Sequence, residues 1–231
     1  VSSNDVMMEM TMAVMKAAPI GVFCLIARTF ANIGFDAFVP MLKYMGCVIL
    51  ALAIQCFVVY QLLLFLFTRL NPFKFLKKFF PVMNFAFTTA TSNATIPLSI
   101  NTLDKKLGVS KKISSFTIPL GATVNMDAVS ILMSFMIMFF ANACGIHVSI
   151  PLMIIILLAN VLLSVGTPGV PGGAIASFAA LATMAGLPAG VLGVYISINT
   201  LCDMGATCVN VIGDMACCSV LKNVIKIEEE A

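Results

Sequence analysis

Charged side chains are scarce in this chain of 231 residues, and their scarcity excludes an ordinary soluble fold. Lys, Arg, Asp and Glu make up 10% of the residues and apolar residues 61%, whereas soluble domains have about 25% and about 45–50%. The stretch 128–202 holds no Asp, Glu, Lys or Arg at all. Such a stretch is too long for one buried helix, so it must contain several membrane segments joined by uncharged turns. The sequence therefore predicts an all-α polytopic membrane protein that contacts the lipid bilayer.

Features of other protein classes are also missing. His147 is the only histidine, so a histidine-based metal site is not expected. The eight cysteines lie in apolar surroundings without a C-x-x-C pair, and we expect small buried residues, not disulfides or zinc ligands. The net charge of +3 is too small to indicate a nucleic-acid partner. The chain begins at Val1 with neither an initiator Met nor a signal peptide, so we expect a fragment or a processed chain.

The basic residues form three clusters, and each should face the cytoplasm because basic loops stay on that side of a membrane. The clusters are Arg69, Lys74, Lys77 and Lys78; Lys105, Lys106, Lys111 and Lys112; and Lys222 and Lys226. The charge-free segment 46–68 is long enough to cross about 30 Å of hydrocarbon, and it ends in the first cluster. An earlier apolar segment over about 7–31 leads into a polar turn at 32–36. We expect a multi-pass protein of a bacterial-type plasma membrane with a cytoplasmic C-terminus.

Two apolar segments have centres that are typical of re-entrant hairpins. Residues 79–103 have a hydroxyl-rich centre at 88–95 and a basic cluster at each end. A hairpin keeps both clusters on one side, whereas a single span, the alternative, would place one of them outside. Residues 150–186 contain the stretch Ser164–Ala174, whose Pro and Gly residues cannot continue an ordinary helix.

Two further spans, 113–142 and about 188–221, carry polar groups at membrane depth. In the first, Gly121 precedes Asn125 and Asp127, which predicts a broken helix whose carbonyls face a ligand. In the second, polar side chains recur at i, i+4, i+8, i+11 and i+15 on one helical face, namely Asn199, Asp203, Thr207, Asn210 and Asp214. No Lys or Arg lies in this stretch, so a metal ion or an amine from outside would supply the positive charge. Alternatively, both acids are protonated and only pack helices.

A weak internal repeat links these two spans. Gly121–Asn125 resembles Gly205–Asn210 with one residue inserted, and each copy follows an interrupted apolar hairpin. On the expected topology the two hairpins enter from opposite sides. A hairpin and a broken or polar helix, repeated in inverted orientation, are typical of a secondary transporter with its site at the membrane midplane. The predicted fold is thus an inverted repeat with two re-entrant helical hairpins and two broken spans.

Three separated motifs resemble one family of transporters. They are Asn125-Met126-Asp127, the tip Gly166-Thr167-Pro168-Gly169-Val170-Pro171-Gly172, and Asp203-Met204-Gly205 followed by Asn210-Val211 and Gly213-Asp214. In this order they are similar to the sodium-coupled glutamate/aspartate and neutral amino-acid transporters, the dicarboxylate/amino acid:cation symporters. Residues Ala18–Phe23 also look like the family's fifth span. The resemblance covers nearly the whole chain and implies a glutamate-transporter-like fold.

The resemblance implies the C-terminal portion of an elevator-type transporter, usually a homotrimer. Residues 1–70 would form two transmembrane helices, family spans five and six. Residues 71–231 would form the transport core of hairpin one, broken span seven, hairpin two and span eight. Family spans one to four are expected to be absent.

The resemblance also implies sodium (Na+) ligands, with oxygen donors of the kind that hard cations prefer. One ion would be bound by Gly121, Asn125, Asn210 and Asp214. A second would be bound by the backbone around Thr123, Ser164, Val165 and Thr167 and by the sulfur of Met126. A third would use Asn125 and Asp127 together with hydroxyls of the third span, which this chain lacks.

The same resemblance assigns an amino-acid substrate site between the hairpin tips. Asp203 would bind the α-ammonium group, in an ion pair strengthened by a low dielectric. Ser92 and Asn210 would bind the α-carboxylate, helped by helix N-termini at the tips. The other residues implied at the substrate are Val129, Val170, Gly172, Ala206 and Thr207.

Departures from the family pattern favour a neutral substrate. Members that carry acidic substrates usually have Arg where this chain has Ala206, Thr in place of Val129, and often Asp in place of Asn199. Without the Arg, an acidic side chain would leave its charge unpaired, which is costly inside a protein. Met133 stands where proton-coupled relatives have Glu, so that coupling is not expected. We predict sodium-coupled symport of a small neutral amino acid such as Ala, Ser, Thr or Cys.

Three alternatives to this prediction stay open. A dicarboxylate or acidic amino-acid symporter would need another cation in place of the missing Arg. An intramembrane aspartyl protease would need two adjacent acids, and Asp203 and Asp214 lie about 16 Å apart along one helix, which leaves Asp127 as a partner for one of them. A non-transporting membrane fragment is the third, because the N-terminal spans are missing. The prediction is a transporter and not an enzyme.

Overall fold

The computed structural model describes residues 20, 23–24, 27, 31 and 38–225, and no strand occurs in this part of the chain. Its elements are α2 (Phe38–Ile54), η2 (Gln55–Val59), α3 (Tyr60–Thr68), α4 (Pro72–Thr89), α5 (Ser92–Leu107), α6 (Lys111–Val124), α7 (Asp127–Ala143), α8 (Ile150–Val165), α9 (Ile175–Met184) and α10 (Val191–Val224). The predicted all-α class is confirmed there. Apart from the isolated positions named above, the expected segments 7–31 and 32–36 lie outside the described residues.

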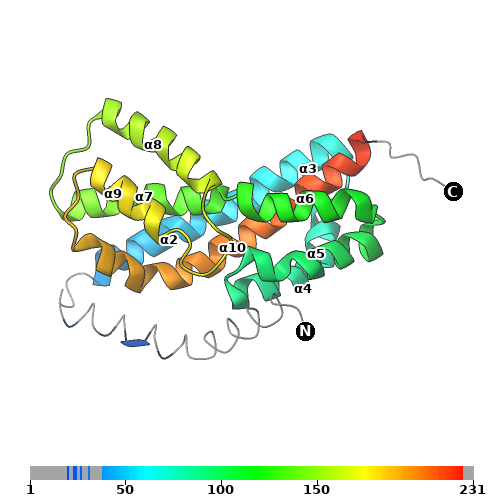
Figure 1. The fold of residues 1–231 in the computed structure, drawn as a ribbon, viewed down its shortest axis with the longest axis horizontal. Helices are drawn as coiled ribbons and strands as arrows, with labels where there is room; N and C mark the ends of the chain where they lie inside the picture. Colours follow the sequence, from blue (N-terminus) through cyan, green and yellow to red (C-terminus); the bar gives the residue numbers. More distant parts are fainter. Residues whose placement is uncertain (1–19, 21–22, 25–26, 28–30, 32–37, 226–231) are drawn as a thin grey trace.

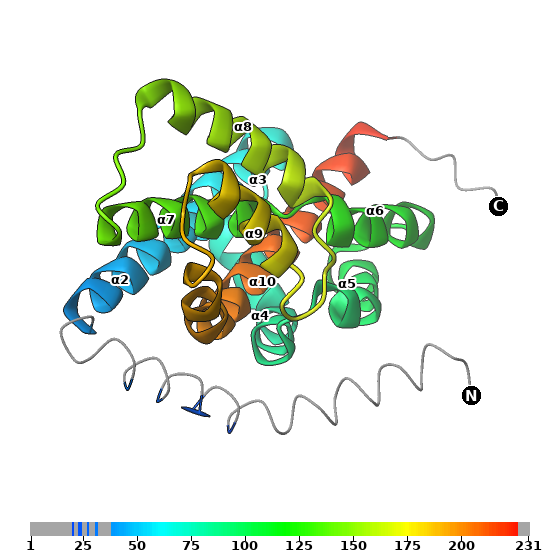
Figure 2. The same ribbon diagram turned by 60° about the vertical axis from the view of Figure 1, so that its left-hand side comes forward.

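Helix α10 lies in the middle of the described structure, and α8 lies at its edge (Figures 1 and 2). The central helix contacts α2 to α7 and α9. Its predicted polar face is confirmed, since all five polar side chains on it are buried, namely Asn199, Asp203, Thr207, Asn210 and Asp214. Helical spacing alone was enough to place these side chains on one face.

Helix α10 runs without interruption, so the prediction of a second broken span is wrong. The prediction came from the family resemblance, together with the weak repeat that relates the Gly205 stretch to the Gly121 stretch. A single glycine inside a helix costs about 1 kcal/mol relative to Ala. The neighbouring helices bury α10 along most of its length, and packing of this kind stabilises a helix more than propensity does. Gly205 therefore stays helical, and the one interruption of a long apolar helix in the described residues lies between α6 and α7.

Two pairs of helices point toward this interruption from opposite ends of the molecule (Figure 1). Helices α4 and α5 pack side by side and are joined by two residues, Ala90 and Thr91. Helices α8 and α9 also pack together and are joined by the longer segment 166–174. We call these connecting segments the first tip and the second tip. They mark the two centres at which the sequence predicted hairpins to turn.

Helices α4 and α5 together cover 72–107, more than the predicted segment 79–103, because the residues that cap the two helices lie outside that segment. The side chain of Asn71 accepts a hydrogen bond from the Lys74 backbone N–H at 3.2 Å, and Pro72 occupies the first turn. Gly108 ends α5 with φ of +61°, a conformation that glycine adopts readily. The lysines that were expected in flanking loops therefore lie within helices, whereas Arg69 lies between α3 and α4.

Three described helical stretches are long and apolar enough to cross a membrane: Val39–Thr68, Lys111–Ala143 and Leu201–Val224. Large apolar side chains on the outer faces are exposed, for example Leu66 at 62% and Leu162 at 76%. Such surfaces are unfavourable in water. They fit an integral membrane protein, in which lipid or other membrane segments cover them.

Candidate functional site

The interruption between α6 and α7 consists of Asn125 and Met126, as the sequence predicted. Asn125 has φ of −87° and ψ of 74°, which is not helical, and α7 begins again at Asp127. The Asn125 N–H still donates to the Gly121 carbonyl at 2.8 Å. The change of direction lets Asn125 reach α10 while Asp127 reaches the rod formed by α2, η2 and α3.

Asn125 connects the interruption to α10. Its Nδ2 donates to Asp214 Oδ1 at 2.9 Å and to the Asn210 carbonyl at 3.2 Å. Asn210 connects back, since its Oδ1 accepts from the Ala128 N–H at 2.9 Å and its Nδ2 lies 3.2 Å from Met126 Sδ. Both Asn210 and Asp214 are buried. The structure thus gathers carboxylate and amide oxygens from two helices into one buried polar cluster.

Two glycines make room for this cluster. A Cβ atom at Gly121 would lie 2.5 Å from Asp214 Oδ1, closer than real Cβ contacts. A Cβ atom at Gly213 would collide with the Tyr60 ring and lie 2.6 Å from Asn125 Nδ2. Asn125 thus contacts each of the other residues of the first predicted sodium set, Gly121, Asn210 and Asp214.

Asp127 is bonded to the α2–α3 rod, a contact that sequence reasoning missed. Its Oδ2 accepts hydrogen bonds from the Tyr60 hydroxyl at 2.5 Å and from Gln55 Nε2, and its Oδ1 accepts from the Ala128 N–H at 2.8 Å. Gln55 and Tyr60 lie in segment 46–68, which was treated only as a charge-free span. The available signal was the presence of hydrogen-bonding side chains at the centre of an apolar segment.

Asp203 is held more loosely, although it is only 9% exposed. In the described residues its carboxylate accepts one hydrogen bond, from the backbone N–H of Gly172 to Oδ2 at 3.3 Å. Gly172 belongs to the second tip and has φ of +74°, in the region that favours glycine. Ala206 is completely buried one turn along α10, and Val129 on α7 is buried as well.

The two tips touch each other at Gly169. Its carbonyl accepts hydrogen bonds from the Thr91 hydroxyl at 2.8 Å and from the Asn93 N–H at 3.3 Å. A Cβ atom at Gly169 would lie 2.7 Å from the Ala122 carbonyl oxygen and 3.3 Å from Ser92 Cβ. The absence of a side chain therefore lets the second tip contact both the first tip and the end of α6. Ser92 is buried beside this contact.

The hydroxyl groups of the residues predicted for a second sodium ion do not hydrogen-bond to one another in the described part of the chain, although the Thr167 N–H donates to the Ser164 carbonyl at 3.1 Å. Thr123 is exposed, and its hydroxyl donates to a carbonyl of its own helix at 2.9 Å. The hydroxyls of Ser164 and Thr167 also donate to carbonyls of α8. Val165 and Val170 are 46% and 44% exposed. Among residues 38–225 no group of three His, Cys, Asp or Glu could hold a metal ion, so carbonyl and amide oxygens would have to contribute.

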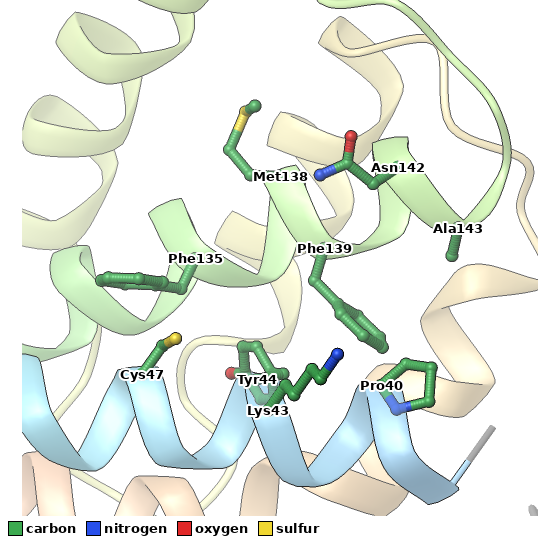
Figure 3. Close-up of a pocket in the computed structure, with 9 residues that line it drawn as sticks. All are labelled: Pro40, Lys43, Tyr44, Cys47, Phe135, Met138, Phe139, Asn142 and Ala143. Atoms are coloured by element: carbon green, nitrogen blue, oxygen red, sulfur yellow. The ribbon is translucent and has the colours of Figure 1, made fainter.

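Two cavities lie away from these residues. Figure 3 shows one of about 490 Å³ between α2 and α7, lined by Pro40, Lys43, Tyr44, Cys47, Phe135, Met138, Phe139, Asn142 and Ala143. The other, of about 500 Å³, is lined by Phe57, Val58, Gln61, Leu62, Phe65, Pro72, Phe73 and Leu76. Neither contains a residue that the sequence assigned to a site, and both linings are mainly apolar.

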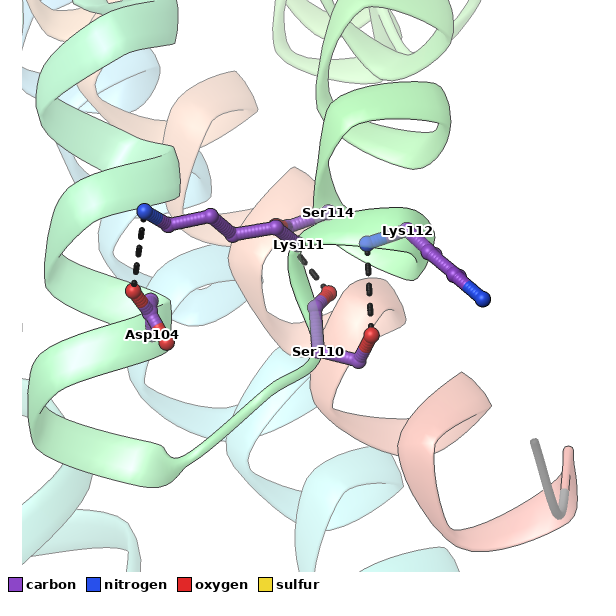
Figure 4. Close-up of polar contacts among 5 residues, drawn as sticks. All are labelled: Asp104, Ser110, Lys111, Lys112 and Ser114. Atoms are coloured by element: carbon purple, nitrogen blue, oxygen red, sulfur yellow. Dashed lines mark hydrogen bonds and ion pairs between the residues drawn. The ribbon is translucent and has the colours of Figure 1, made fainter. Parts of the chain in front are cut away.

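The interior acidic side chains are separated in space from the basic ones. Every Lys and Arg in the described residues is exposed, whereas Asp203 and Asp214 are buried and Asp127 is partly buried. The one ion pair in that part of the chain lies at the surface, where Lys111 Nζ is 3.7 Å from Asp104 (Figure 4). An interior acid without a basic partner is costly, and such acids usually mark cation or substrate pathways.

Figure 4 also shows how the turn between α5 and α6 is stabilised. The Ser110 hydroxyl oxygen accepts from the Lys112 backbone N–H at 3.2 Å, and the Ser114 hydroxyl donates to the Ser110 carbonyl at 3.3 Å. This cap fixes the start of α6, at whose other end Asn125 lies.

Comparison with known proteins places the chain in a family. The profile of the sodium:dicarboxylate symporter family matches residues 1–224. The chain belongs to the sodium:dicarboxylate symporter family. The family resemblance read from the sequence is therefore confirmed. Symporter family members are transporters and not enzymes, so the intramembrane protease alternative has no support.

Individual members of the symporter family are similar to this chain over almost its whole length. It is 30% identical over 230 residues to an excitatory amino acid transporter of Caenorhabditis elegans, covering 99% of this chain and 46% of that protein. It is 34% identical over 215 residues to the neutral amino acid transporter B(0) of Mus musculus, covering 92% of this chain and 39% of that protein. The chain thus spans less than half the length of these relatives.

Proposed function

We propose that this chain forms the sodium- and substrate-binding part of a symporter for small neutral amino acids. The observation that carries the proposal is the separation of charge, with three acids inside the helix bundle and every described Lys and Arg outside it. The positive partners of these acids then come from outside the protein. Sodium ions and the α-ammonium group of an amino acid are such partners.

One sodium ion binds at the cluster of Gly121, Asn125, Asn210 and Asp214. The hydrogen bonds around Asn125 support this assignment, because they hold oxygen donors close to one buried carboxylate. A third ion uses Asn125 and Asp127. The second ion uses the backbone around Thr123, Ser164, Val165 and Thr167 together with the sulfur of Met126. The contact between α6 and α8 supports that second site.

The amino acid binds at Asp203. A carboxylate has about four lone-pair positions, and Asp203 uses one of them for the Gly172 N–H, so it can accept hydrogen bonds from an ammonium group. Ser92 and Asn210 bind the α-carboxylate, and Val170, Gly172 and Thr207 complete the lining. Ala206 and Val129 form an apolar wall that suits a small side chain.

Transport follows an elevator mechanism in a homotrimer, with 71–231 as the moving core. Helix pairs α4–α5 and α8–α9 are the re-entrant hairpins of an inverted repeat and act as gates. Their approach from opposite ends and the contact at Gly169 support these roles. Lys222 Nζ donates to the Leu107 carbonyl at 2.6 Å, which brings two basic clusters to one end and supports a cytoplasmic C-terminus.

Symport of acidic amino acids is the second candidate, favoured by the likeness to an excitatory transporter. It requires a cation near Ala206 to pair with the substrate's side-chain carboxylate. The described Lys and Arg residues are all exposed, which argues against such a cation. The relatives named for neutral amino acids favour the first candidate.

Uptake of labelled serine and aspartate by proteoliposomes tests the proposal. The complete protein that carries this chain is reconstituted and assayed with and without an inward sodium gradient. We expect sodium-dependent serine uptake and little aspartate uptake. Robust aspartate uptake would favour the second candidate, and serine uptake that ignores the sodium gradient would contradict the proposed coupling.

A further inference from the structure

We propose that Gln55 and Tyr60 form a clamp that positions the Asp127 carboxylate for cation binding. Both side chains donate to the same oxygen, Asp127 Oδ2. They reach it from the α2–α3 rod across to the start of α7. The inference rests on the proposed sodium coupling and adds two positioning residues to it.

A π-helical turn creates the clamp. In an α-helix, residues five apart point about 140° away from each other, so Gln55 and Tyr60 could not meet one oxygen atom. Here Gln55–Val59 form a π-turn, closed by a hydrogen bond from the Tyr60 N–H to the Gln55 carbonyl. A π-turn brings residues i and i+5 together on one face. Both side chains therefore point toward Asp127.

Neighbouring residues hold the π-turn in place. The side chain of Gln61 is buried, and its Nε2 donates to the Cys56 carbonyl at 3.0 Å, which satisfies a carbonyl within the turn. Gly213 on α10 lies directly against the Tyr60 ring, with no space for a Cβ atom. The turn is thus supported on both sides, and isolated π-turns of this kind often occur at functional sites.

The clamp leaves Asp127 both oriented and able to bind a cation. The Gln55 amide, the Tyr60 hydroxyl and the Ala128 N–H fill three of the about four lone-pair positions of the carboxylate. All three donors are neutral, so the negative charge is not cancelled. One lone-pair position stays open, and its direction is set by the other three.

Sodium titrations of uptake test the clamp in the complete protein. The variants are Tyr60→Phe, which removes only the hydroxyl, and Gln55→Met, which removes the donor at similar size. Tyr44→Phe is the matched control, because Tyr44 is buried on the same rod and, among the described residues, only Gln55, Tyr60 and the Ala128 N–H donate to Asp127. Each protein is assayed for the sodium concentration at half-maximal serine uptake and for the maximal rate at saturating sodium.

We expect each clamp variant to raise the half-maximal sodium concentration about tenfold, the value of one hydrogen bond to a charged group. The maximal rate should stay within about twofold, and Tyr44→Phe should behave like the unchanged protein. An unaltered half-maximal sodium concentration, or a lower maximal rate alone, would overturn the clamp. If Tyr60→Phe does not fold, Gln55→Met decides by the same criterion. Sodium-independent uptake by the unchanged protein would instead overturn the proposed function and the clamp with it.

Discussion

The interior acids of this chain differ in how firmly the protein holds them. Asp127 and Asp214 accept hydrogen bonds from side chains of other segments at 2.9 Å or less. Asp203 is similarly buried, yet it contacts one backbone N–H of the second tip at 3.3 Å. A bare ion needs oxygen atoms that are already in place, whereas an amino acid brings its own donors. The firmly held Asp127 and Asp214 therefore suit sodium sites, and the loosely held Asp203 suits a substrate site beneath a gate.

Replacing Asp203 tests the loosely held acid and has the largest expected effect. Asp203→Asn keeps the shape but removes the charge that pairs with an α-ammonium group. Breaking a buried ion pair costs about 3–5 kcal/mol, so serine uptake should fall at least about a hundredfold. Asp104→Asn is the matched control, because Asp104 pairs with Lys111 at the surface, where such pairs contribute little. Near-normal serine uptake by Asp203→Asn would contradict the assignment of Asp203 to the substrate.

Crowding Asp214 tests the firmly held group and has an intermediate expected effect. In Gly121→Ala the new Cβ would lie 2.5 Å from Asp214 Oδ1, so the carboxylate must move. The half-maximal sodium concentration for serine uptake should rise about tenfold, as expected for about 1.4 kcal/mol. Gly46→Ala serves as control, since no atom lies within 4 Å of its Cβ position. If both variants keep the original sodium dependence, Asp214 is not a sodium ligand.

Replacing Gly205, which lies between Asp203 and Asp214 on α10, has the smallest expected effect on serine uptake. Its Cβ would lie 3.4 Å from Leu52 Cδ1, an ordinary contact, and α10 is helical throughout. Gly205→Ala should stabilise the helix by about 0.5–1 kcal/mol and leave serine uptake within about twofold. Thermal unfolding with an uptake assay measures both. A strong loss of uptake would mean that α10 has to open at Gly205 during transport.

Local pattern was enough to predict several features of the fold and the site. The 3.6-residue period placed Asp203 and Asp214 on one buried face of α10. The run Asn125-Met126-Asp127, with its polar groups at membrane depth, predicted the interruption between α6 and α7. Glycine and proline at 166–174 predicted the second tip.

Contacts between distant segments could not be predicted in this way. A regular helical period places Gln55 and Tyr60 on different faces, so the clamp on Asp127 depends on a π-turn that periodicity does not reveal. The contact of Thr91 with Gly169 joins residues of two helix pairs, and no local signal specifies it. Burial of α10 by its neighbours outweighed the local effect of Gly205, which is why the second broken span was wrongly expected.

Sodium binding by the Asp203→Asn protein tests the central claim most directly, namely that separate acids serve the ion and the amino acid. Binding of radiolabelled sodium to the purified complete protein is measured without any amino acid, alongside binding of serine at saturating sodium. Sodium affinity should stay within about twofold of the unchanged protein, while serine binding is lost. Loss of sodium binding together with serine binding would contradict the claim, because all the interior acids would then serve one shared site.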